Sequence, residues 1–182
     1  MILVYVLLGI IIVLAVYVIA TYNGLIRLKN RVQEAESDID VQLKRRYELI
    51  PNLVETVKGY AKHERELFEK VTKERASLVT GSTAEKIQAS NQLTDTLKSI
   101  FAVAENYPDL KANQNFLQLQ NDLTDTQDKI MSAQRFYNGN VRDFNTKLQV
   151  FPTNIYAQML GFTQFNFIEA NEAEKTNVEV KF

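Results

Sequence analysis

The sequence predicts an all-α protein in which an N-terminal transmembrane helix leads into an elongated, antiparallel, up-and-down four-helix bundle. Residues 2–20 are apolar throughout and carry no charge. Beyond them, apolar residues recur three or four positions apart, which is the spacing of one face of a helix. Only three prolines and six glycines interrupt the 182 residues. No segment alternates apolar and polar residues for long enough to predict a sheet.

The N-terminal apolar stretch has the length of a membrane span. As a helix, residues 2–20 would be roughly 28 Å long, close to the hydrocarbon core of a bilayer at about 30 Å. A buried core helix is one alternative, but soluble domains rarely enclose a helix that is apolar on all sides. A cleaved signal peptide ending at residues 18–20 is another, although no Lys or Arg precedes the stretch and its length exceeds that of a usual signal. We expect an uncleaved anchor, with Tyr22 at the membrane interface.

Charges beside the anchor predict its orientation and set the expected domain organisation. Arg27, Lys29 and Arg31 follow the anchor closely, whereas only the α-amino group precedes it. Because Lys and Arg accumulate on the cytoplasmic side, we expect the N-terminus outside and the bundle in the cytoplasm. The expected organisation is a transmembrane anchor at residues 1–21, a helical bundle domain at residues 22–168 and a C-terminal tail at residues 169–182.

The first bundle helix is expected to continue the anchor without a break and to end in a tight reversal at residues 49–52, with a sharp kink there as the lesser alternative. Pro51 lies there, and a proline inside a helix costs about 3 kcal/mol. Asn52 with Glu55 three residues later has the spacing of a capping box, which would open the second helix.

Two further helices are expected after a second reversal. Ser82 with Glu85 forms another capping-box pattern, which predicts the start of the third helix. Pro108 predicts its end, since the residue before a proline is pushed out of helical angles. The fourth helix is expected over residues 113–150, where apolar residues follow in steps of three or four until Pro152.

The composition argues against several kinds of chemistry. A net charge of −1 gives no electrostatic case for binding nucleic acid, and the absence of Cys excludes disulfides and thiolate metal sites. His63 is the single histidine, so neither a zincin helix nor a di-iron bundle site can be assembled. No Gly-x-Gly phosphate loop is present. We therefore expect no catalytic residues, no cofactor, no metal and no enzyme activity.

Two groups of residues are candidates for contacts with partners. Lys44, Arg45 and Arg46 form a dense basic run before the expected reversal, and they could either dock a partner or simply form a solvated face with helix-spaced ion pairs. The aromatic segment 152–168 would follow the fourth helix at the membrane end of the bundle. Its side chains Phe162, Phe165 and Phe167 could contact the membrane or a neighbouring subunit, or could cap the core of the bundle itself.

Several runs of residues carry a resemblance to a known family. They are 39–46 (Ile-Asp-Val-Gln-Leu-Lys-Arg-Arg), 49–54 (Leu-Ile-Pro-Asn-Leu-Val), 57–64 with its Gly-Tyr-Ala-x-His-Glu, 105–112 with its Glu-Asn-Tyr-Pro, Asn115-Phe116, Arg135-x-Tyr137-Asn138, Phe151-Pro152, Gly161-Phe162 and the closing Val-x-Val-Lys-Phe. The chain resembles the bacterial LemA family over nearly its whole length. That resemblance implies a single-pass membrane protein with a long helical bundle, and it supplies no catalytic residues.

These features lead to two functional hypotheses. The first is a non-enzymatic, membrane-anchored bundle that acts as a scaffold or self-assembles at the bacterial cell envelope, with the lipid bilayer and further copies of itself as partners. The alternative is an adaptor or accessory subunit of another membrane protein, such as an envelope protease or a transporter, with the basic run at Lys44, Arg45 and Arg46 as the contact. An anchor, a bundle and the lack of a catalytic constellation suit both.

Overall fold

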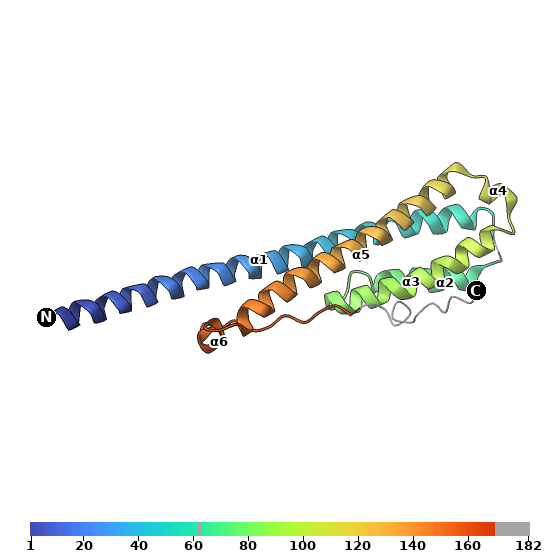
Figure 1. Cartoon of the computed structure of the whole chain (residues 1–182). Helices are drawn as coiled ribbons and strands as arrows, with labels where there is room; N and C mark the ends of the chain where they lie inside the picture. Colours follow the sequence, from blue (N-terminus) through green and yellow to red (C-terminus); the bar gives the residue numbers. More distant parts are fainter. Residues whose placement is uncertain (62, 170–182) are drawn as a thin grey trace, which may run out of the picture. The chain divides into compact units, whose positions relative to one another are not determined.

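The computed structural model describes residues 1–61 and 63–169, and all regular secondary structure within these ranges is helical (Figure 1). The predicted all-α class is therefore confirmed, including a long apolar N-terminal helix. The helices are α1 (Ile2–Lys58), α2 (Arg65–Ala76), α3 (Thr83–Ala104), α4 (Pro108–Lys111), α5 (Gln114–Gln149) and α6 (Thr153–Tyr156).

The chain divides into two compact units, and α1 and α5 each contribute to both. Unit 1 comprises Met1–Ala35 and Phe136–Phe167. Unit 2 comprises Glu36–Arg135, together with Ile168 and Glu169. The predicted tail at 169–182 lies outside the described residues except for its first residue.

Unit 1 pairs the N-terminal part of α1 with the C-terminal part of α5. Its buried residues come from both helices and from the segment after α6: Leu25, Val32, Ala35, Tyr137, Val141, Phe144, Leu148, Ala157 and Phe162. They recur at three- and four-residue spacing within each helix, which places them on one face. This face begins only after residue 20, so the apolar stretch before it takes no part in the core of unit 1.

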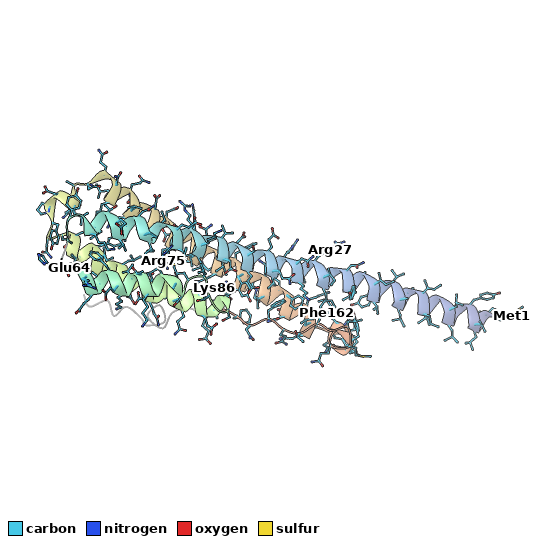
Figure 2. The ribbon with its side chains drawn as sticks, turned by 180° about the vertical axis from the view of Figure 1, so that it is seen from behind. Met1, Arg27, Glu64, Arg75, Lys86 and Phe162 are labelled. Carbon is cyan, nitrogen blue, oxygen red and sulfur yellow. The ribbon has the colours of Figure 1, made fainter. Side chains whose placement is uncertain are left out.

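The apolar stretch at the start of α1 is exposed. Within the described residues, α1 contains the one stretch long and apolar enough to cross a membrane, and no residue of that stretch is buried. Figure 2 shows its side chains standing free between Met1 and Arg27. Full exposure rules out the core-helix alternative, because a core helix would be covered. A signal peptide would have the same length, composition and exposure.

Unit 2 contains segments of α1, α2, α3 and α5 whose apolar faces are buried. Its largest fully buried apolar side chains are Ile39, Leu43, Ile50, Leu53, Leu78, Leu93, Ile100, Leu110 and Ile130. Polar contacts also connect the segments: Lys86 Nζ lies 2.8 Å from Asp40 Oδ1, and Thr83 Oγ1 donates to Glu36 Oε1 at 2.8 Å. Both contacts join the start of α3 to α1.

The predicted start of the third helix is confirmed in detail. Ser82 caps α3, and its backbone N–H donates to Glu85 Oε2 at 2.7 Å while Glu85 N–H donates to Ser82 Oγ at 3.4 Å. The backbone and side-chain hydrogen bonds from Ser82 lower the pKa of Glu85. The predicted fourth helix, at 113–150, corresponds to α5 within one residue at each end.

The predicted reversal at residues 49–52 is wrong. Helix α1 runs through Pro51 to Lys58, and the chain reverses between Gly59 and Glu64 instead. Asn52 therefore lies inside a helix and caps nothing, and α2 is shorter than the helix expected there. The expectation of an unbroken helix from the anchor into the bundle domain is confirmed.

A contact from α2 explains how α1 accommodates its proline. Pro51 has no N–H, so the carbonyl of Tyr47, four residues earlier, lacks its usual helical donor. Arg75 Nε donates to that carbonyl at 2.8 Å. The Arg75 guanidinium also lies 3.6 Å from the centre of the Tyr47 ring, which adds a cation–π contact. A side chain of α2 thus supplies the hydrogen bond that Pro51 removes from α1.

This arrangement predicts an energetic coupling between Pro51 and Arg75. Arg75→Met should lower the free energy of unfolding by about 1–3 kcal/mol, because it leaves the Tyr47 carbonyl without a donor. In a Pro51→Ala background, the new N–H of residue 51 can bond to that carbonyl, so the same substitution should cost less. Denaturant titrations of the four proteins of this double-mutant cycle measure the difference.

Arg65→Met is the matched control for this cycle, since Arg65 is an exposed arginine on the same helix that forms an ion pair with Glu69 at 2.8 Å. It should have nearly the same small effect in both backgrounds. Equal losses from Arg75→Met with and without Pro51 would contradict the explanation.

Candidate functional site

The predicted basic run is divided between the surface and the interior of unit 2. Lys44 and Arg45 are exposed. Arg45 Nη1 lies 3.6 Å from Asp125 Oδ2, and Lys129 Nζ lies 2.9 Å from the same oxygen. Exposed ion pairs of this kind contribute about 0–1 kcal/mol. Lys44 and Arg45 are therefore on the surface of unit 2, and their docking to a partner stays a prediction.

Arg46 is not part of that surface, which corrects the prediction. Its side chain is 1% exposed and is among the largest fully buried side chains of the described residues. Nη1 donates to Ser90 O at 3.1 Å, to Ser90 Oγ at 2.6 Å and, through a short contact, to Gln127 Oε1. Nη2 donates to Thr94 Oγ1 at 2.8 Å. Arg46 thus connects α1 to α3 and α5 inside unit 2 and cannot take part in docking.

The hydrogen bonds donated by Arg46 go to uncharged oxygens. Burial lowers the pKa of Arg46 to about 10, because a desolvated guanidinium loses hydration. The group is therefore still protonated at pH 7. The Arg46 Nε has no acceptor among the described residues. The buried Oε1 of Gln42, one turn earlier on α1, has no donor among them either. The site is a buried cation held by neutral dipoles, which makes its partners critical for stability.

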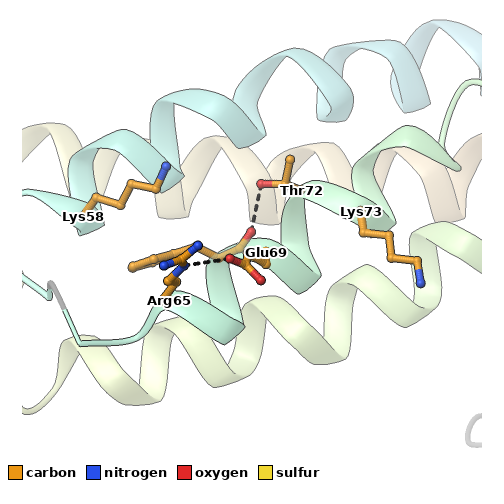
Figure 3. A pocket seen from close by; sticks show the side chains of 6 residues that line it. Lys58, Arg65, Glu69, Thr72 and Lys73 are labelled. Atoms are coloured by element: carbon orange, nitrogen blue, oxygen red, sulfur yellow. Dashed lines mark hydrogen bonds and ion pairs between the residues drawn. The ribbon is translucent and has the colours of Figure 1, made fainter.

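A groove with a basic lining lies between the end of α1 and α2. Its volume is about 650 Å³, and the residues that line it are Lys58, Arg65, Phe68, Glu69, Thr72 and Lys73. Figure 3 shows Lys58 on α1 facing Arg65, Glu69 and Thr72 on α2. Arg65 Nε donates to Glu69 Oε1 at 2.8 Å, and Thr72 Oγ1 donates to the Phe68 carbonyl at 2.8 Å. Excess positive charge over an aromatic floor suits an acidic, partly apolar partner.

The three predicted aromatic residues have different environments in unit 1. Phe162 is buried, with its ring centre 5.6 Å from that of Tyr22 and 6.3 Å from that of Phe144. Phe165 is half-buried and lies 5.2 Å from Phe144. Phe167 is 53% exposed. Phe162 and Phe165 thus cover the core of their own unit, which was the alternative to a membrane or subunit contact, and Phe167 alone stays free for such a contact.

Residues that could perform chemistry are scattered. Within residues 1–61 and 63–169, no group of three His, Cys, Asp or Glu side chains is placed to hold a metal ion. His63 lies in the turn between α1 and α2. The one hydroxyl in the lining of the basic groove, on Thr72, donates to the Phe68 carbonyl.

Sequence reasoning missed both the buried arginine and the basic groove. The signal for Arg46 was present, since it lies three residues after Leu43 and four before Ile50, on the same apolar face of α1. The groove was missed because the reversal was expected at residues 49–52. That expectation placed Lys58 and Lys73 on one helix, whereas the structure places them on two helices that face each other across a turn.

Comparisons with known proteins give a family model and several relatives. The model of the LemA family matches residues 35–182. The chain is 30% identical to Protein LemA of Metamycoplasma hominis over 86% of this chain and 73% of that protein. It is 21% identical to Magnetosome protein MamQ of Magnetospirillum gryphiswaldense, and 22% identical to Magnetosome protein MamQ 2 of Paramagnetospirillum magneticum. Both of these alignments cover 86% of this chain and 68% of the relative.

The geometry at Arg46 predicts how its replacement affects stability. Arg46→Met keeps much of the buried volume but removes the donors, so it should lower the free energy of unfolding by about 1–3 kcal/mol. Adding Ser90→Ala, Thr94→Val and Gln127→Met removes the orphaned side-chain acceptors and leaves only the Ser90 backbone carbonyl. The fourfold variant should recover most of the loss, because replacing both partners of a buried polar contact is often close to neutral. Chemical denaturation followed by circular dichroism measures all three proteins.

Arg45→Met is the control for this series, as it changes an exposed neighbour with the same side chain. It should change stability by less than about 1 kcal/mol. If Arg45→Met and Arg46→Met had equal effects, Arg46 would not be the buried connection described here.

Proposed function

The chain belongs to the LemA family, and from this premise we propose that it is a membrane-anchored, non-enzymatic helical protein that acts as a scaffold or self-assembles at the bacterial cell envelope. The observation that carries the proposal is the exposed apolar stretch of α1, which no part of unit 1 covers. The names of its relatives, Protein LemA and Magnetosome protein MamQ, do not describe enzymes. An apolar surface of this length requires lipid or protein around it.

We further propose the finer arrangement. Residues 1–21 serve as the anchor, residues 22–168 form an up-and-down four-helix bundle domain, and residues 169–182 are a tail. The N-terminus lies outside and the bundle lies in the cytoplasm, in accordance with Arg27, Lys29 and Arg31 after the span. The contacts of α1 with α3 and α5 through Arg46 support the bundle arrangement within unit 2.

A second candidate function is that of an adaptor for another membrane protein, such as an envelope protease or transporter. The basic groove favours it, because Lys58, Arg65 and Lys73 surround the aromatic Phe68 in a cavity wide enough for a peptide segment. Lys44 and Arg45 add exposed positive charge to the same unit. Such a surface would select an acidic partner by charge complementarity.

Native mass measurement in a mild detergent tests self-assembly. The full chain should appear at two or more times its own mass. Replacing residues 2–20 with leucine throughout keeps an apolar span but removes the particular side chains that helices in a membrane use to pack. This variant should therefore form smaller assemblies. The measurement reads the number of chains in each particle directly.

Two results would weigh against self-assembly through the anchor. A strictly monomeric full chain would contradict it and favour the adaptor. Unchanged assembly size in the all-leucine variant would show that copies contact one another elsewhere. Lys58→Glu with Lys73→Glu is a control for assembly, since these changes alter the basic groove and leave the anchor intact.

Labelling of introduced cysteines tests the orientation. The chain contains no cysteine, so each single substitution gives one unique label. Ser99→Cys, on an exposed position of α3, should resist a membrane-impermeant maleimide in intact cells and react after lysis. Reaction in intact cells would place the bundle outside and reverse the proposed orientation.

A further inference from the structure

A second apolar surface of unit 1 lies in the segment around α6. Phe151 is 79% exposed, Ile155 is 65% exposed and Met159 is 86% exposed. Val150 and Leu160 beside them are also exposed. We refer to residues 150–160 as the apolar turn. Single exposed apolar side chains are ordinary on protein surfaces, whereas a cluster of large ones marks an interaction surface.

The apolar turn lies within a stretch that lacks charge. No Asp, Glu, Lys or Arg occurs from residue 148 to residue 168, between Lys147 and Glu169. The polar residues in this stretch are Gln, Asn, Thr and Tyr. A loop facing water in a chain with 24% charged residues would be expected to contain several charges. Apolar tips with neutral polar neighbours are suited to the boundary between water and lipid.

The turn lies level with the end of the apolar stretch of α1. Gly161 adopts a left-handed φ of +79°, which turns the chain so that Phe162 enters the core. The Phe162 ring meets Tyr22, two residues beyond the apolar stretch, with ring centres 5.6 Å apart. Figure 2 shows Phe162 beside α1, close to the level of Arg27. The residues just before Phe162 are therefore held beside the helical turn where a membrane span would end.

Hydrogen bonds within the apolar turn and from α5 to the segment after it hold the backbone of this region in place. Phe162 N–H donates to the Ala157 carbonyl at 3.1 Å, and Leu160 N–H donates to that of Tyr156 at 3.1 Å. Asn145 of α5 holds Phe165 from both sides, because its amide nitrogen donates to the Phe165 carbonyl at 2.8 Å and its amide oxygen accepts from the Phe165 N–H at 3.0 Å. The exposed side chains therefore project from a backbone that is fixed to α5.

We propose that the apolar turn inserts into the interfacial layer of the same membrane that the anchor spans, with Phe151, Ile155 and Met159 as the inserted side chains. The partner is a lipid surface. This proposal rests on the proposed function, since it requires residues 2–20 to span a bilayer. Contact with lipid is favoured over contact with a second copy because a turn level with Tyr22 adjoins lipid in every spanning copy. Arg27 and Arg31, exposed beyond Tyr22, suit the lipid phosphates.

Single tryptophans test the proposal cleanly, because the chain has none of its own. The full chain is reconstituted at high dilution in phosphatidylcholine vesicles whose acyl chains carry bromine either near the headgroup or near the methyl end. Met159→Trp and Ile155→Trp should show blue-shifted emission. Bromine near the headgroup should quench this emission more strongly than bromine near the methyl end of the acyl chain. These positions are exposed, so the substitutions leave the core intact.

Two control positions in the same unit calibrate the depth. Tyr5→Trp, in the apolar stretch, should be quenched by bromolipid wherever the anchor spans the bilayer. Phe136→Trp replaces an exposed aromatic residue of α5. Phe136 lies about 12 Å along α5 from Phe144, in the direction away from the apolar turn. It should emit as a tryptophan in water and should not be quenched.

The outcomes separate this inference from the proposed function. If Tyr5→Trp is quenched while Met159→Trp and Ile155→Trp behave like Phe136→Trp, the apolar turn does not insert and the inference fails alone. Blue-shifted emission at Met159→Trp without quenching shows contact with protein, and this also overturns it. An unquenched Tyr5→Trp shows that residues 2–20 do not span the vesicles, which overturns the proposed function together with this inference.

Discussion

An apolar helix that no other part of unit 1 covers is unfavourable in water. This constraint determines how unit 1 is arranged. Every residue from 2 to 16 of α1 is exposed, and buried positions begin only at Thr21 and Leu25. At about 25 cal/mol per Å² of apolar surface, leaving such a stretch in water would carry a large penalty. Transfer into a membrane removes that penalty. The buried core of unit 1 begins where the apolar stretch ends.

Inside unit 2, two arginines form hydrogen bonds that neither regular helix geometry nor apolar packing provides. Arg75 donates to the one carbonyl of α1 that Pro51 deprives of its helical donor. Arg46 lies on the apolar face of α1 and donates to α3 and α5. Each contact needs one relative placement of helices, whereas apolar side chains tolerate several. We infer that these two polar contacts, the one of Arg46 buried and the one of Arg75 part-buried, specify the register of α1 against its neighbours.

The comparison of sequence with structure follows the range of the interactions involved. Local signals predicted the long apolar N-terminal helix, the cap of α3 and the extent of α5 within one residue at each end, because hydrophobic period and capping depend on neighbours within a few residues. The reversal at Pro51 was mispredicted because the donor that rescues the helix, Arg75, is distant in the sequence. The basic run suggested a docking patch or a solvated face, because the acceptors that hold Arg46 in the interior lie on α3 and α5, far away in the sequence. Phe162 and Phe165 turned inward for the same reason, which left the side chains of the apolar turn outside.

A single membrane-spanning helix does not fix the orientation of a protein relative to the membrane, since one helix can tilt and rotate within the bilayer. A second contact, offset to one side of that helix, removes this freedom. In unit 1 the apolar turn lies on the side of α1 that faces α5, because Phe162 packs against both Tyr22 and Phe144. Insertion of the turn would therefore fix the rotation of α1 about its own axis and draw α5 toward the lipid surface. Copies anchored in this way would share one orientation, which is what lateral assembly of a membrane scaffold requires.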